Sequence, residues 1–154
     1  TLEFDDFKFR CCVGKNGVKQ NKLEGDKSTP KGIFEIGLVY YRADRIKKPN
    51  TLVKLKIIKP NMAWCNDSKS KFYNKEIKIN KSISHEILYR KDYKYDIFLV
   101  IKYNYKKTKK GLGSAIFLHL TKNYQPTAGC IALKKKDFLI LLRLINTKTK
   151  LKVS

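Results

Sequence analysis

The sequence predicts a single, mostly β domain over residues 1–154, with one or two helices. A chain of 154 residues has the length of one domain that can bury its own core. Short segments rich in β-branched and aromatic residues recur along it, whereas the apolar spacing of an amphipathic helix occurs convincingly only once. No internal repeat or low-complexity linker divides the chain, so one domain is the economical interpretation.

The expected strands follow in chain order. The run from Phe4 to Cys11 alternates and ends at the turn residues 14–17. Residues 33–41 are β-branched and aromatic, and 96–103 and 114–120 contain compact apolar runs. Residues 149–153 alternate again. Residues 21–31 are instead polar and contain turn formers, which predicts a surface loop.

The convincing helix follows the segment around residue 130 and is preceded by Lys134–Lys136. Its apolar side chains repeat at three- and four-residue spacing: Phe138, Leu141, Leu142 and Ile145. Residues 42–95 are polar, aromatic and too long for an ordinary connection, which indicates a functional insertion. Residues 105–113 are expected to form a Lys-rich loop.

The net charge of +22 is the largest compositional signal. Lysines are spread over nearly every segment, and no helix-turn-helix, zinc-finger or RNA-binding signature accompanies them. We therefore expect no nucleic-acid partner, and consider attraction to another anionic polymer. No apolar run approaches the roughly 20 residues of a membrane helix, and no signal peptide is visible in this chain, so no transmembrane segment is expected.

The cysteines do not predict a metal site. They lie at positions 11, 12, 65 and 130, with no Cys-x-x-Cys pair and neither histidine at ligand spacing. We expect no metal and no organic cofactor. Whether Cys65 is free or disulfide-bonded stays open at this point.

Residues 114–133 carry the chemical signal. A strand ends near His119, a polar loop follows, and Gly129-Cys130 opens a second apolar stretch. A thiol is only a few per cent ionised near neutrality, and a neighbouring imidazole can accept its proton. Gly129 would let a carbonyl approach the backbone, where the amides of Thr127, Ala128 and Gly129 are oxyanion candidates. The plainer interpretation is a buried small cysteine beside a hydrogen-bonded core histidine.

The same stretch resembles the YkuD-type L,D-transpeptidase family, in a branch with the pattern Gly-Ser-x-Ile-Phe-x-His and then Pro-Thr-x-Gly-Cys-x-x-Leu. The matching residues are Gly113, Ser114, Ile116, Phe117, His119, Pro126, Thr127, Gly129, Cys130 and Leu133. Further similar blocks are Glu24-Gly25-Asp26, Thr29-Pro30-x-Gly32-x-Phe34, 41–45, 64–67, Tyr73-Asn74, 84–86, 93–96 and Tyr103-Asn104. The resemblance therefore extends over nearly the whole chain.

The resemblance implies a sandwich- or barrel-like β domain in which Cys130 is the nucleophile and His119 its base. It implies acyl transfer between peptidoglycan stem peptides, donor and acceptor, through a thioester, and hence a place in the periplasm or cell envelope. The commoner family pattern has His where this chain has Ala128, and Arg or Asn where it has Ala132. This branch is associated with 1→3 linkage, so either 1→3 or 3→3 cross-links are expected.

Other polar and aromatic residues are weaker candidates for binding substrate. His85 could bind substrate or make a structural hydrogen bond, and Arg42 and Asp44 could recognise a stem peptide or pair with each other. Trp64 and Tyr93 could line the cleft or cover the core. Asn104 and Ser114 could assist the site or fix loops and strand edges.

Two alternative functions remain from the sequence. Water could resolve the thioester, which would make the protein an L,D-carboxypeptidase or an amidase that releases wall-linked protein. The chain could also bind an anionic wall polymer through its positive surface, without catalysis.

Overall fold

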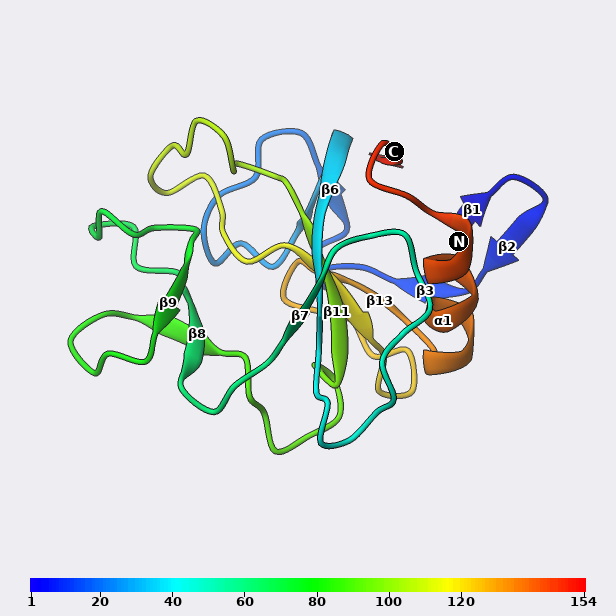
Figure 1. The fold of residues 1–154 in the computed structure, drawn as a ribbon. Coiled ribbons are helices and arrows are strands. Elements are labelled where there is room, and N and C mark those ends of the chain that lie inside the picture. Colours follow the sequence, from blue (N-terminus) through cyan, green and yellow to red (C-terminus); the bar gives the residue numbers. More distant parts are fainter.

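The computed structural model describes all 154 residues and is built around one central sheet (Figure 1). Its strands lie in the order β14-β6-β11-β12-β13-β3, and β7 also pairs with β6. Their bounds are β3 Cys11–Cys12, β6 Gly32–Tyr41, β7 Leu55–Ile57, β11 Ile97–Ile101, β12 Phe117–Leu120, β13 Ile131–Leu133 and β14 Lys150–Val153. Neighbours are antiparallel except the parallel pairs β6–β7 and β12–β13.

Smaller elements cover this sheet. A three-stranded sheet has the order β10-β8-β9, and two strand pairs, β1–β2 and β4–β5, lie outside both sheets. Their bounds are β1 Leu2–Phe4, β2 Phe7–Phe9, β4 Val18–Lys19, β5 Thr29–Pro30, β8 Met62–Cys65, β9 Glu76–Lys78 and β10 His85–Ile87. The one helix, α1, runs from Lys135 to Leu144.

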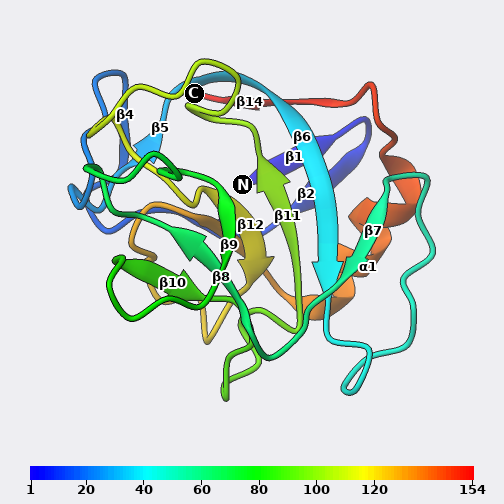
Figure 2. The same ribbon diagram turned by 60° about the vertical axis from the view of Figure 1, so that its left-hand side comes forward.

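The central sheet separates two cores. One core contains aliphatic residues of the sheet and the buried side of α1. The other is aromatic and joins the sheet to β8, through Tyr40, Trp64, Phe98 and Phe117. Figures 1 and 2 show α1 on one side of the sheet and β8 and β9 on the other. The chain is thus mostly β with layered, curled sheets, as the sequence predicts.

The alternation of β12 sets the position of His119. Successive side chains of a strand point to opposite faces. Leu118 and Leu120 enter the aliphatic core, whereas Phe117 packs in the aromatic core. His119 therefore points to the aromatic side, where its ring lies edge-on to Tyr95, with ring centroids 5.3 Å apart.

The structure confirms several predicted elements. The helix forms where its spacing predicts it, with Phe138, Leu141 and Leu142 buried. The strands predicted at 33–41, 96–103, 114–120 and 149–153 appear as β6, β11, β12 and β14. The middle segment 42–95 is less irregular than its sequence indicates, because it contains β7, β8, β9 and β10. The only helix is short and too polar to cross a lipid bilayer.

Two predictions about local structure are wrong. The alternating run from Phe4 to Cys11 is not one strand, because the chain reverses at Asp5, whose φ is +47°, and forms the β1–β2 hairpin. Residues 21–31 do not form a surface loop throughout: most of 21–27 is exposed as predicted, but Ser28 and Thr29 are fully buried. Polar residues enter the interior here because the buried groups find hydrogen-bond partners there.

Candidate active site

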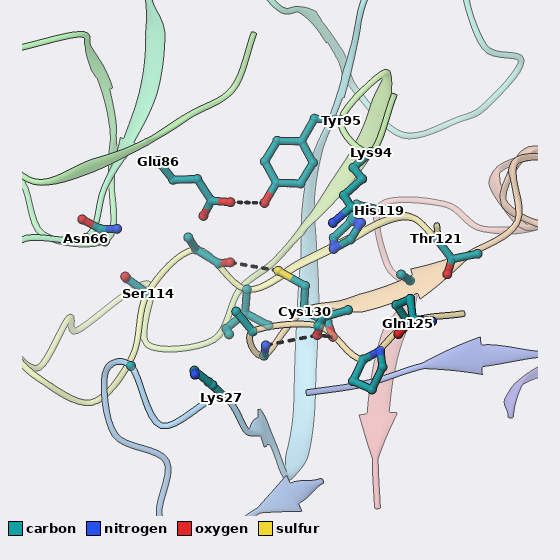
Figure 3. Close-up of a pocket in the computed structure, with 18 of the residues that line it drawn as sticks. Lys27, Asn66, Glu86, Lys94, Tyr95, Ser114, His119, Thr121, Gln125 and Cys130 are labelled. Carbon is teal, nitrogen blue, oxygen red and sulfur yellow. Dashed lines mark hydrogen bonds between the residues drawn. The ribbon is translucent and has the colours of Figure 1, made fainter. Parts of the chain in front are cut away.

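A pocket of about 400 Å³ opens beside the aromatic core, and both His119 and Cys130 line it. Figure 3 shows these two side chains and Tyr95 and Glu86 arranged around the same space. The pocket wall also includes the segment from Gln125 to Cys130 and residues of the 22–27 loop.

Parallel pairing of β12 and β13 brings the thiol and the imidazole to one face. Leu118 is opposite Ile131 and His119 opposite Ala132 in this register. Cys130 precedes Ile131, so its side chain lies on the same face as that of Ala132. His119 on β12 and Cys130, directly before β13, consequently lie diagonally across this strand pair and line one pocket.

The Cys130 thiol is held by the backbone of the 115–117 segment. Its Sγ donates to the carbonyl of Ala115 at 3.2 Å and accepts from the amide of Phe117 at 3.4 Å. Ala115 adopts a φ of +52°, and the amide oxygen of Asn74 accepts its N–H at 3.0 Å. Only 9% of Cys130 is exposed, and burial, with the nearby Glu86 carboxyl, raises the thiol pKa to about 12.

The His119 ring is oriented by its neighbour in the chain. Its Nδ1 lies 2.9 Å from the carbonyl oxygen of Leu120, an acceptor, so Nδ1 carries the proton and Nε2 is left as the basic nitrogen. Burial lowers the pKa of His119 to about 4, although the Leu120 carbonyl acts in the opposite direction. The imidazole is thus neutral at pH 7. No hydrogen bond joins it to the thiol, whose partners are both backbone groups.

The segment 14–29 supports the loop before Cys130 through hydrogen bonds. Thr29 Oγ1 accepts the Gly14 amide at 2.8 Å and donates to the Gly129 carbonyl at 2.9 Å. The Lys15 amide donates to the carbonyl of Thr127 at 2.9 Å, and a parallel bridge joins Gly14 to Thr127. This buried cross-connection fixes the backbone on which the thiol sits.

The predicted oxyanion segment 127–129 lines the pocket, and its amides divide into two groups. The Thr127 amide donates to the Val13 carbonyl, and the Gly129 amide donates to Thr127 Oγ1 at 3.1 Å. The amides of Ala128 and Cys130 make no hydrogen bond within the chain. Of the three predicted oxyanion residues, only Ala128 therefore has a free amide, and the amide of Cys130 is a second free donor beside it.

Charged side chains surround the pocket unevenly. Its lining contains two acids, Glu24 and Glu86, and five bases, Lys22, Lys27, Arg90, Lys94 and Lys122. Glu86 accepts a hydrogen bond from the hydroxyl of Tyr95 (Figure 3), and burial raises the pKa of the Glu86 carboxyl. The mouth of the pocket therefore presents mainly positive charge.

Most of the other candidates lie outside this pocket. Arg42 pairs with Asp44 at 2.6 Å and stacks on the ring of Tyr89, 3.4 Å from its centroid. Trp64 is buried and donates through Nε1 to Asn74 at 2.9 Å. Each of these side chains is occupied in an internal contact, and none lines the pocket.

The remaining candidates divide between the pocket and the loops. His85 Nδ1 lies 2.6 Å from the carbonyl oxygen of Ile83, and Tyr93 is 46% exposed and lines a different pocket. Asn104 ties its own loop through the carbonyls of Lys109 and Gly113. Only Ser114 lines the pocket, and its hydroxyl donates to Glu24 at 2.7 Å.

Sequence reasoning missed two pocket residues that lie one and two positions after its candidates His85 and Tyr93. Glu86 and Tyr95 line the pocket in place of His85 and Tyr93. Alternation along β10 could have suggested Glu86, since adjacent residues of a strand face opposite ways. Lys22 had no comparable signal, because a lysine in a polar stretch is ordinarily exposed.

The donor set around the pocket contains no group of three or more His, Cys, Asp or Glu side chains arranged to hold a metal ion. All four cysteines, Cys65 included, are free thiols. The pocket is therefore built around one thiol and one imidazole.

The comparisons with known proteins agree with this architecture. The model of the YkuD family, described as the L,D-transpeptidase catalytic domain, matches residues 5–153. No curated protein and no solved structure matches the chain. The match covers nearly the whole chain and includes both strands that carry the thiol and the imidazole. The chain belongs to the YkuD family of L,D-transpeptidase catalytic domains.

Proposed function

We propose that the protein is a cysteine-dependent acyl transferase that acts on peptidoglycan stem peptides, with Cys130 as nucleophile and His119 as general base. The observation that carries the proposal is the placement of a neutral imidazole on β12 and of a thiol directly before the neighbouring strand β13, both lining one pocket. Because peptidoglycan lies in the cell envelope, this proposal places the protein in the periplasm or cell envelope.

The first half of the reaction forms a thioester. His119 Nε2 accepts the thiol proton as Sγ attacks a stem-peptide carbonyl carbon. The carbonyl oxygen becomes an oxyanion, which the free amides of Cys130 and Ala128 stabilise. The C–N bond then breaks, and His119 returns the proton to the leaving amine, so the imidazole is neutral again.

The second half transfers the acyl group. The amine of an acceptor stem attacks the thioester carbon, and His119 takes the proton that this amine loses. The C–S bond breaks, the sulfur is reprotonated by His119, and a new amide links the two stems. Free thiol and neutral imidazole are restored.

The resting state of the pair is neutral. A thiol pKa of about 12 and an imidazole pKa of about 4 favour thiol and imidazole over thiolate and imidazolium at pH 7. Proton transfer must therefore accompany the attack on the carbonyl, where the growing oxyanion offsets the cost of charging His119. A buried neutral pair is also protected from oxidation, since the thiolate is the reactive form.

The charge of the pocket mouth supports an anionic substrate. Stem peptides carry free carboxylates, and the pocket lining includes the exposed Lys27 and Lys122 and the half-buried Lys94. Ala128 and Ala132 present only methyl groups to the cavity. Their small size leaves room in the pocket at the two positions where the commoner family pattern has larger polar residues.

Product analysis tests the proposal. The protein is incubated with a stem-peptide donor, with and without an acceptor stem amine, and the products are identified by mass spectrometry. A cross-linked dimer supports transfer, and fragmentation of that dimer distinguishes 1→3 from 3→3 linkage. A shortened peptide without a dimer contradicts transfer and indicates hydrolysis. Unchanged peptide with both wild type and Cys130→Ala contradicts catalysis on this substrate altogether.

A further inference from the structure

The side chain of Lys22 is almost fully buried at the base of the active-site pocket, with 3% of its surface exposed. Two of its three ammonium hydrogens have acceptors, Asp26 Oδ1 at 2.7 Å and the carbonyl of Leu23 at 3.3 Å. An ammonium has three donors, so one N–H is unused within the chain. A buried charge of this kind is costly unless every donor finds a partner.

Two glycines make room for this side chain. A Cβ on Gly113 would lie 2.9 Å from Cε of Lys22, and a Cβ on Gly129 would lie 3.5 Å from its Nζ. Both glycines have positive φ angles, +104° and +141°, which other residues rarely adopt. The ammonium consequently lies against the backbone of Gly129, directly before the thiol-bearing residue.

The Asp26 carboxylate has hydrogen-bond donors other than Lys22. The Asp26 carboxylate also accepts hydrogen bonds from the amide of Leu23 and from the amide and hydroxyl of Ser28. Although burial alone would raise it, these bonds and that from Lys22 hold the pKa of Asp26 below its usual range. Asp26 would thus stay bonded without the lysine, so loop closure by itself does not explain a buried ammonium.

We propose that Lys22 supplies the fixed positive charge of the reaction centre, and that its unused N–H binds the negative charge that develops when Cys130 attacks. This inference rests on the proposed function for its catalytic meaning. Lys22 is a neighbouring cation that lowers the thiol pKa, opposing Glu86, while Tyr95 and His119 complete the set of titratable groups around the sulfur. The same charge would attract a carboxylate of the substrate next to the scissile bond.

Alkylation of Cys130 measures this charge without any turnover. Iodoacetamide is neutral and iodoacetate is anionic, and the modified Cys130 peptide is quantified by mass spectrometry at about pH 8, where alkylation is proportional to thiolate. Lys22→Met keeps the volume of the stem and removes the charge. We expect alkylation by iodoacetamide to fall roughly tenfold, equivalent to one pKa unit, and alkylation by iodoacetate to fall further.

The ratio of the iodoacetate rate to the iodoacetamide rate distinguishes the loss of a positive charge from a change in solvent access to the Cys130 thiol. A change in access alone alters both reagents alike, whereas loss of a cation lowers the iodoacetate rate more. Lys19→Met, which removes an exposed lysine outside the pocket, serves as the matched control and should leave the ratio unchanged. Asp26→Asn removes the counter-charge of Lys22 and should raise both rates. If Lys22→Met does not fold, Lys22→Gln is used in the same alkylation measurement.

Equal iodoacetate-to-iodoacetamide ratios in wild type and the Lys22 variant would overturn the inference. If the ratio falls in the variant but the wild type forms no thioester or cross-link, the charge assignment stands and the proposed function fails. If both stand, kcat/KM for acyl transfer should fall roughly 100-fold in Lys22→Met, the size expected when one donor to an oxyanion is lost.

Discussion

At the scale of single residues, burial governs the chemistry of the site. The same dry surroundings raise the pKa of Cys130 to about 12 and lower that of His119 to about 4. Both groups are therefore uncharged before substrate arrives, and burial is the main cause for each. The Leu120 carbonyl holds the proton on Nδ1 and leaves Nε2 as the basic nitrogen of His119.

The buried imidazole predicts a loss of stability in mild acid. The unfolded chain binds a proton at His119 near pH 6.5, whereas the folded protein binds it only near pH 4. Between these values the unfolded state holds more protons, so the free energy of unfolding falls as the pH falls, by about 2 kcal/mol from roughly pH 6.5 to 5. Urea denaturation of wild type and His119→Gln measures this slope. An equally steep slope in the variant would refute the assignment.

At the scale of elements, β12 and the start of β13 position the reacting groups, and the segment 14–29 supports the loop before Cys130. The sequence showed two apolar stretches joined by a polar loop, but it did not show that the two strands pair in parallel. The strand–loop–strand order and the helix were visible in the spacing of apolar residues. The inward course of residues 21–31 was not, because their polarity resembles that of a solvated loop until their buried partners, such as the Gly129 carbonyl, are known.

Thr29→Val tests the support that this segment gives. The substitution keeps the shape of a fully buried side chain but orphans the amide of Gly14 and the carbonyl of Gly129. Two unsatisfied buried groups should reduce the free energy of unfolding by about 2–4 kcal/mol. Acyl transfer should also fall, because the backbone before Cys130 loses its anchor.

Thr147→Val provides the matched control, since Thr147 is exposed and makes no side-chain hydrogen bond. Its unfolding midpoint and activity should equal those of the wild type. If Thr29→Val were as stable and active as this control, the segment 14–29 would not support the loop before Cys130.

At the scale of the whole molecule, the net charge of +22 is distributed widely, and the pocket shares it, with five bases and two acids in the lining. The sequence showed the amount of charge and not its position, because the charged residues of the pocket come from distant segments of the chain. The same holds for Glu86 and Tyr95, which meet only through the packing of β10 against the core.

The charge predicts that salt weakens substrate binding more than it slows the chemical step. Raising the ionic strength from about 0.01 to 0.3 M shortens the range of the field severalfold. KM for a stem peptide with free carboxylates should rise, while kcat changes little, because the buried reaction centre is poorly screened. A donor whose carboxylates are amidated is the control. Equal salt dependence for both donors would show that the positive entrance does not recognise those carboxylates.

The most direct test of the whole account is intact-mass spectrometry of the protein after exposure to an acyl donor, either a carbapenem or a stem-peptide donor. The account predicts one covalent adduct, mapped by peptide analysis to Cys130, slowed by about 100-fold or more in His119→Gln and absent in Cys130→Ala. An adduct on Cys11, Cys12 or Cys65 instead, or no adduct with the folded wild-type protein, would contradict it.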